Sequence, residues 1–267
     1  KEVTLIGYEI IEDGSGDLPV LLPFSEMAGQ MAVHLAAHYI QNSTGGRGIL
    51  VGSVPGVPPP TVLILGAGTV GRAAARQALA SGAHVIVLDA DLAKLRRLNR
   101  DFLGRAVTVL AGLERLEKYT ALSDVVIGAI LIPGGRPPLL ITESMVKSMK
   151  QGSVIIDVSI DQGGCVETSR PTDIENPTFK AHGVLHYCVP NMTANIARTA
   201  SRALATAALP YLLDLAGKGL TAAVNEDTGF AAGVNLYRGK LVKKVVGETL
   251  GFPVTPLESL LGKGARS

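Results

Sequence analysis

One stretch carries most of the information about the fold: Thr-Val-Leu-Ile-Leu-Gly-Ala-Gly-Thr-Val-Gly, residues 61–71. Its first five residues are apolar or β-branched, and a short run of this kind is typical of a buried strand. The residues that follow, 72–80, are rich in Ala, Arg, Gln and Leu, which favour a helix. A strand, a Gly-x-Gly-x-x-Gly turn and a helix in this order predict a binding site for the phosphates of a dinucleotide.

Each glycine of this motif has its own expected role. Gly66 permits the tight turn, Gly68 lets the backbone approach a pyrophosphate, and Gly71 allows close packing of helix on strand. A second apolar strand, 85–88, ends at Asp89. An acid there suits the ribose hydroxyls of NAD and would repel the 2′-phosphate of NADP. The alternative is that Asp89 only caps a helix over 90–97.

Composition narrows the class of protein. A chain of 267 residues that is 47% hydrophobic, with 31 Gly and 15 Pro, suits a folded α/β protein with many turns. The formal net charge of +2 argues against nucleic acid as a partner. The two cysteines, Cys165 and Cys188, lack metal-ligand spacing and are expected to be reduced thiols in a cytoplasmic protein. The longest apolar runs, such as 125–133, are too short for a membrane span.

From residue 61 onward, apolar runs and helical patterns alternate regularly, which predicts an α/β fold with a Rossmann-type doubly wound parallel sheet. Near the start of the chain we expect a strand over 3–11 and a helix that Ser25 caps and that extends to about 41. The last long helix is expected to be broken or kinked at Pro210. The strands are expected at 61–65, 84–88, 106–110, 124–129, 153–158 and 184–188, and the helices at 69–81, 91–100, 112–119, 142–149 and 195–216.

The carboxyl ends of four strands are the expected ligand site, because ligands bind there in open α/β sheets. Besides the glycine turn, these ends carry 130–135, 159–164 and 189–192. Apolar walls with one acid and one amide are what a nicotinamide ring needs. A pair of histidines, His34 and His38, stands four residues apart on the first helix, but no third ligand is in view, so no metal site is predicted.

Several motifs beyond the glycine turn make the chain resemble the alanine dehydrogenase family, which is related to the NAD-binding first domain of proton-pumping transhydrogenase. The likeness extends over most of the chain, from about 7 to 251. The most specific block runs from Asp-Gln-Gly-Gly-Cys to Ser-Arg-Pro-Thr, and it favours alanine dehydrogenase over transhydrogenase. The motifs are Ser-Glu-Met-Ala-Gly at 25–29, Gly-Ser-Val-Pro-Gly-Val at 52–57, Ile-Pro-Gly at 132–134, residues 160–165, 167–172, and His-Tyr-Cys-Val-x-Asn-Met at 186–192.

The resemblance implies an oxidoreductase that converts L-alanine and NAD to pyruvate, ammonia and NADH, and that assembles as a homo-oligomer. It also implies a Rossmann domain at 28–197, with 1–27 and 198–267 as pieces of a second α/β domain on the substrate side. The family's substrate-binding Arg and catalytic Lys and His would lie in a segment before Lys1. Because the chain starts at Lys1 without an initiator Met, three alternatives stay open: a trimmed chain, a processed product or a renumbered fragment. Without those residues, the chain is expected to bind NAD yet to be inactive.

The resemblance also assigns roles to individual residues. Asp161 is the implied catalytic acid, beside the reacting carbon. Its alternative role is to accept the backbone N–H groups of Gly163 and Gly164. The implied cofactor contacts are Ser25 from the interdomain helix, Gly66, Gly68, Thr69, Val70 and Gly71 at the pyrophosphate, Asp89 and Lys94 at the adenosine, Ile130 and Leu131 as walls, and Ile160, Asp161, Arg170, Val189, Asn191 and Met192 around the nicotinamide.

Three of these contacts have plainer alternatives. Arg170 is alternatively a salt-bridging loop residue, Asn191 a helix cap and Lys94 a solvated helix residue. Two further functions also stay open for the whole chain. One is an NAD-binding module or subunit without its own catalysis, and the other is a dehydrogenase of another small amino acid.

Overall fold

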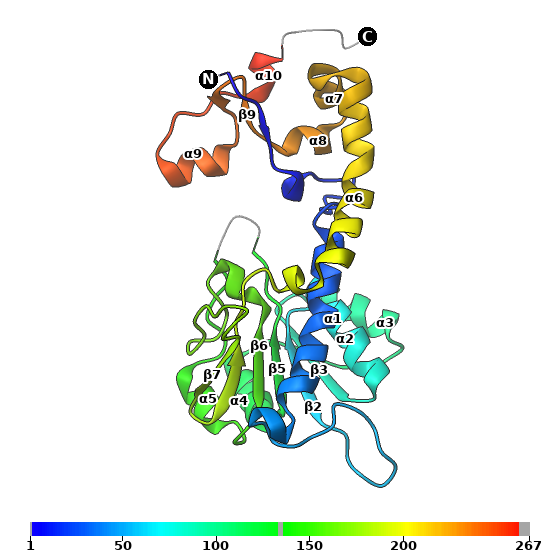
Figure 1. Ribbon diagram of the computed structural model, residues 1–267, viewed down its shortest axis with the longest axis vertical. Helices are drawn as coiled ribbons and strands as arrows, with labels where there is room; N and C mark the ends of the chain where they lie inside the picture. The colour runs from blue at the N-terminus through cyan, green and yellow to red at the C-terminus, as the bar shows by residue number, and fades with distance from the viewer. Residues whose placement is uncertain (1, 133–135, 262–267) are drawn as a thin grey trace. The chain divides into compact units, whose positions relative to one another are not determined.

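The computed structural model describes residues 2–132 and 136–261 (Figure 1). Its chain divides into two compact units, Ser25–Asn195 and the pair of segments Lys1–Phe24 and Ile196–Ser267. The predicted boundaries, after 27 and after 197, lie close to these divisions. The assignment of the outer segments to a substrate domain stays a prediction.

The unit Ser25–Asn195 is built on a seven-stranded sheet in the order β4-β3-β2-β5-β6-β8-β7 (Figure 1). All neighbours pair in parallel except β7 with β8, so the predicted doubly wound parallel sheet is confirmed, with an antiparallel strand added at one edge. The strands are β2 (Thr61–Leu65), β3 (His84–Asp89), β4 (Val107–Leu110), β5 (Val125–Gly128), β6 (Val154–Asp157), β7 (Thr178–Ala181) and β8 (Val184–Tyr187).

Both faces of this sheet are covered, which explains why its central strands are apolar throughout. One face, with Ile64 and Val87, packs against α1, α2 and α3, and the other, with Leu63 and Ile86, packs against α4 and α5. Asp91 caps α3 by accepting N–H groups of Ala93 at 2.7 Å and Lys94 at 3.3 Å. The helices are α1 (Leu22–Tyr39), α2 (Thr69–Ser81), α3 (Leu92–Asp101), α4 (Leu113–Leu122) and α5 (Glu143–Ser148).

The second unit has a small antiparallel sheet in the order β1-β9-β10, together with five helices in its described residues. Its core contains Ile11, Phe230, Val234 and Tyr237. The strands are β1 (Leu5–Ile6), β9 (Val234–Tyr237) and β10 (Lys240–Leu241), and the helices are α6 (Ala197–Lys218), α7 (Leu220–Glu226), α8 (Thr228–Ala232), α9 (Lys244–Leu250) and α10 (Leu257–Leu260).

Three local predictions are wrong. The strand expected over 3–11 is only Leu5–Ile6, because it pairs with β9 alone and then turns into a 3-10 helix at Tyr8–Ile10. Ser25 does not cap α1, which already begins at Leu22, since Pro23 fits a first turn where its missing N–H costs nothing. The predicted break at Pro210 is also wrong, because α6 continues through this residue, whereas the alternative of a kink there stays a prediction.

Candidate functional site

The glycine turn between β2 and α2 has the geometry that its sequence predicts. Gly66 has φ +105°, a left-handed conformation that side chains disfavour, and its N–H donates to the Leu88 carbonyl at 2.7 Å. A Cβ at Gly66 would lie 2.6 Å from the Ala129 oxygen and 3.0 Å from Cδ1 of Ile130. The turn therefore lies directly against the end of β5, where the predicted apolar wall begins.

The other two glycines of the turn differ in what surrounds them. A Cβ at Gly71 would collide with the carbonyl oxygen of Gly66, so helix and turn touch backbone to backbone. A Cβ at Gly68 would meet nothing within 4 Å. Gly68 is also the N-cap of α2, and it provides no side-chain hydrogen bond to the first turn.

This arrangement fits a dinucleotide. The first N–H groups of a helix need acceptors from outside the helix, and phosphate oxygens supply them at the positive end of the helix dipole. The open space beside Gly68 leaves room for such a group, and Thr69 and Val70 form the first turn of α2. The pyrophosphate role of these residues stays a prediction.

Asp89 ends β3 beside the glycine turn. One carboxylate oxygen accepts the N–H of Ala67 at 2.6 Å, and the other accepts the N–H of Asp91 at 2.8 Å. Asp89 is therefore not the cap of α3, which is Asp91, and the alternative role considered for it is wrong in that form. Its position next to the turn suits the predicted ribose contact.

The turn after β6 carries Asp161. It is a 3-10 helix, Val158–Gln162, that follows the buried carboxylate of Asp157. Asp161 accepts the backbone N–H of Asn191 at 2.8 Å, so the ends of β6 and β8 are joined by two predicted site residues. The N–H groups of Gly163 and Gly164 instead donate to the carbonyls of Ile160 and Ser159, which excludes the alternative partners considered for Asp161.

Asn191 itself adopts φ +50°, a left-handed conformation that Asn tolerates better than most residues. This conformation directs its N–H to the Asp161 carboxylate. The side chains of both residues are exposed at the carboxyl edge of the sheet.

The predicted apolar residues line the same edge at different depths. Ile160, Val189 and Met192 are buried, Ile130 is half-buried, and Leu131 is 49% exposed. The loop after β5 continues into residues 133–135 of the Ile-Pro-Gly motif, which lie outside the described residues. Only Leu131 among these five offers a largely free apolar surface.

Three predicted contacts lie farther out. Ser25 is one helical turn before Gly29, where a Cβ would collide with the Val70 carbonyl, so it shares the face of α1 that meets the start of α2. Lys94 is exposed in the first turn of α3. Arg170 places its guanidinium 4.3 Å from the centroid of the Phe179 ring, a cation–π contact instead of the salt bridge considered as its alternative.

Three further titratable groups of this unit are buried. Burial lowers the pKa of His186 to about 4, and burial raises the pKa of Cys188 to about 12. Cys165 is also a buried free thiol. Over residues 2–132 and 136–261, no group of three His, Cys, Asp or Glu side chains could hold a metal ion.

Sequence reasoning missed three polar side chains beside Asp161: Asp157, Ser159 and Gln162. They hold backbone groups of neighbouring loops, as described below, and no spacing rule identifies such contacts. Gln162 did stand inside the recognised Asp-Gln-Gly-Gly motif, which was the one available signal.

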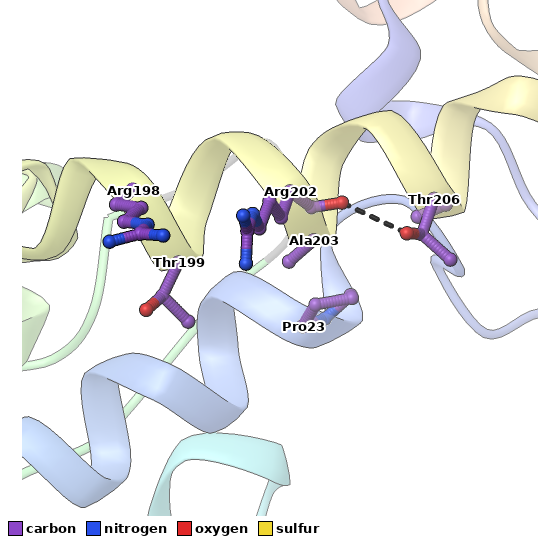
Figure 2. A pocket seen from close by; sticks show the side chains of 7 residues that line it. Pro23, Arg198, Thr199, Arg202, Ala203 and Thr206 are labelled. Carbon is purple, nitrogen blue, oxygen red and sulfur yellow. Dashed lines mark hydrogen bonds between the residues drawn. The ribbon is translucent and has the colours of Figure 1, made fainter.

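The second unit has a hollow of its own along α6 (Figure 2). Figure 2 shows Arg198 and Arg202 one turn apart, and the Thr206 hydroxyl donates to the Arg202 carbonyl at 2.9 Å. Both arginines are exposed. The hollow is lined by Pro23, Arg198, Thr199, Arg202, Ala203, Thr206 and Ala207.

The doubly wound sheet, the glycine turn against the end of β5 and the acid at the end of β3 together define a Rossmann-type dinucleotide-binding protein. The model of the alanine dehydrogenase/PNT C-terminal domain matches residues 32–244. The chain belongs to this family, so the resemblance is confirmed, and the family is a dinucleotide-binding one.

Individual relatives also support membership of this family. An alanine dehydrogenase of Halomonas elongata is 47% identical over 97% of this chain and 70% of its own length, and one of Mycobacterium tuberculosis is 44% identical with the same coverage. A solved L-alanine dehydrogenase superposes with a TM-score of 0.89 at 42% identity, covering 93% of this chain and 68% of its own. A transhydrogenase from Sinorhizobium meliloti has a TM-score of 0.71 at 26% identity, covering 90% and 66%.

No helix in the described residues is both long enough and apolar enough to cross a membrane.

Proposed function

We propose that this chain binds NAD and forms the larger part of an alanine dehydrogenase, which oxidises L-alanine to pyruvate and ammonia. The observation that carries the proposal is the Asp161–Asn191 contact at the end of the sheet that also holds the glycine turn. The names of relatives at 41–47% identity supply the substrate.

NAD, when bound, would supply the hydride acceptor for oxidation of the α-carbon of the amino acid. The N–H groups at the start of α2 would hold the pyrophosphate, and Asp89 would hold the adenosine ribose. Leu131 and Ile130 would exclude water from one side of the nicotinamide. In this proposal the Asp161 carboxylate would stabilise the positive charge that develops on the substrate nitrogen.

A second candidate function rests on the share of its relatives' length that the chain covers. The chain spans 70% of the length of the curated relatives named above. On this basis the second candidate is an NAD-binding module or subunit without its own catalysis. A dehydrogenase of another small amino acid is the remaining candidate. We also propose a cytoplasmic homo-oligomer, in keeping with the family.

Titration calorimetry with NADH and a turnover assay with L-alanine and NAD separate these functions. NADH binding together with turnover supports the dehydrogenase, and binding alone supports the module. Turnover of another small amino acid in preference to L-alanine would select the third candidate. If the chain did not bind NADH at millimolar concentration, all three functions would be wrong.

Asp161→Asn is expected to weaken NAD⁺ binding about threefold more than NADH binding. The oxidised nicotinamide ring carries a positive charge that the carboxylate attracts, while the reduced ring is neutral, and solvent screening keeps the effect small. Asp173→Asn is the matched control, because Asp173 is also an exposed loop acid that accepts a backbone N–H, from Asn176. Equal changes for both cofactor forms would show that Asp161 does not face the ring.

A further inference from the structure

Gln162 holds the backbone of a loop that is distant in sequence. Its Oε1 accepts the N–H of Ile132 at 3.2 Å, and its Nε2 donates to the carbonyl of the same residue at 3.0 Å. One carboxamide thus satisfies both backbone groups of Ile132, as a neighbouring strand would. The loop after β5 is thereby fixed to the turn after β6.

A second side chain of the same turn strengthens this link. The Ser159 hydroxyl accepts the N–H of Ile130 at 3.0 Å, and Ser159 is 4% exposed. Ile130 and Ile132 are therefore both tied to Val158–Gln162, with Leu131 between them. The same turn contacts Asn191 through Asp161, so it supports both the loop after β5 and the loop after β8.

The turn Val158–Gln162 is itself held by a buried carboxylate, that of Asp157. Asp157 is 1% exposed and accepts the N–H groups of Ser159 and Cys165, each at 3.1 Å. A Cβ at Gly128 or Gly164 would lie 2.9 or 2.8 Å from its carboxylate oxygens, so glycine at both positions makes room for the carboxylate. The turn cannot shift without breaking these buried contacts.

We propose that Gln162 is a positioning residue for the nicotinamide half of the cofactor. It holds the Ile130–Leu131 wall at a fixed distance from Asp161, so that the ring meets a formed surface. This inference rests on the proposed NAD binding. It assigns Gln162 no contact with the adenosine half, which belongs to the glycine turn and Asp89.

The test compares two ligands that share the adenosine half. In Gln162→Met, which removes both hydrogen bonds without adding charge, the Kd of NADH is expected to rise about tenfold, as the loss of two ordinary hydrogen bonds implies. The Kd of ADP-ribose is expected to stay unchanged. The increase in NADH fluorescence on binding, which reports an apolar surface around the ring, is expected to fall. In Gln162→Glu, a carboxylate oxygen would face the Ile132 carbonyl, and the same pattern is expected.

Gln151 offers a matched control. It precedes β6, whereas Gln162 follows it, and its Nε2 donates to the His182 carbonyl at 3.1 Å. Gln151→Met is expected to change neither Kd, and thermal unfolding checks that each variant is folded.

Two results would overturn the positioning role while leaving cofactor binding intact. One is a Gln162→Met chain with wild-type affinity for NADH, and the other is an equal loss for NADH and ADP-ribose. The proposed function itself is tested on the wild-type chain. It fails if the wild-type chain binds NADH no more tightly than ADP-ribose, or if it binds neither ligand. That result would overturn the positioning role as well.

Discussion

The Gly71→Ala chain is expected to lose about 3 kcal/mol of unfolding free energy. The added methyl would overlap the Gly66 carbonyl oxygen and lie 3.4 Å from Cγ2 of Ile64. Gly66 cannot retreat, because its N–H is bonded to Leu88 and its α-carbon faces the Ala129 carbonyl. The collision therefore separates α2 from β2 at the centre of the sheet. Urea unfolding followed by circular dichroism measures the loss.

Gly68→Ala is the matched control from the same motif. Its methyl would meet no atom within 4 Å, and its φ of −72° is open to any residue, so stability is expected to be unchanged. The Kd of NADH is nevertheless expected to rise about tenfold or more, because the methyl occupies space that a pyrophosphate needs. Equal stability of the two variants would contradict the packing role of Gly71. Wild-type NADH affinity in Gly68→Ala would contradict the phosphate role of the turn.

The chain is also expected to lose about 3 kcal/mol of stability through one histidine as the pH falls from 6.5 to about 4. His186 in β8 is fully buried, stacks on Phe179 with centroids 4.9 Å apart, and accepts the Thr168 hydroxyl at Nε2 over 2.8 Å. Its Nδ1 lies 3.1 Å from the Val184 carbonyl, which can only accept, so Nδ1 carries the proton of the neutral ring.

The sign follows from the direction of the shift. Burial lowers the pKa of His186 from its ordinary 6.5 to about 4 in the folded chain, so the unfolded chain binds more protons in that window. Stability is therefore full above the unfolded pKa and decreases as the pH falls. Urea unfolding at several pH values measures the slope, which His186→Gln is expected to flatten. The exposed His84→Gln is the control, and an unchanged slope in His186→Gln would refute the assignment.

Most of the first sheet could be predicted from the sequence because its strands are buried on both faces. Residues such as Leu63 and Ile64 point to opposite faces, yet both must be apolar, so each strand is a continuous hydrophobic run. β7 escaped prediction, because Thr178–Ala181 is an edge strand that forms by pairing antiparallel with β8. Likewise, β9 and β10 depend on pairing within the second unit.

The candidate site could be predicted only to the level of strand ends. Adjacent parallel strands place Asp161 and Asn191 at one edge, and this much follows from topology. The actual hydrogen bond depends on the positive φ of Asn191, which no periodicity reveals. The two hydrogen bonds between Gln162 and Ile132 could not be predicted either, because they join a side chain to the backbone of a residue 30 positions away.

The strand order β4-β3-β2-β5-β6-β8-β7 reverses direction between β2 and β5. This switch point divides the proposed site: the residues proposed for the adenosine half follow β2 and β3, on one side of it. Those proposed for the nicotinamide half come from β5, β6 and β8 on the other. Substitutions after β2 and β3 can therefore alter the preferred nucleotide, while the turn that carries Asp161 on the other side of the switch point keeps its geometry.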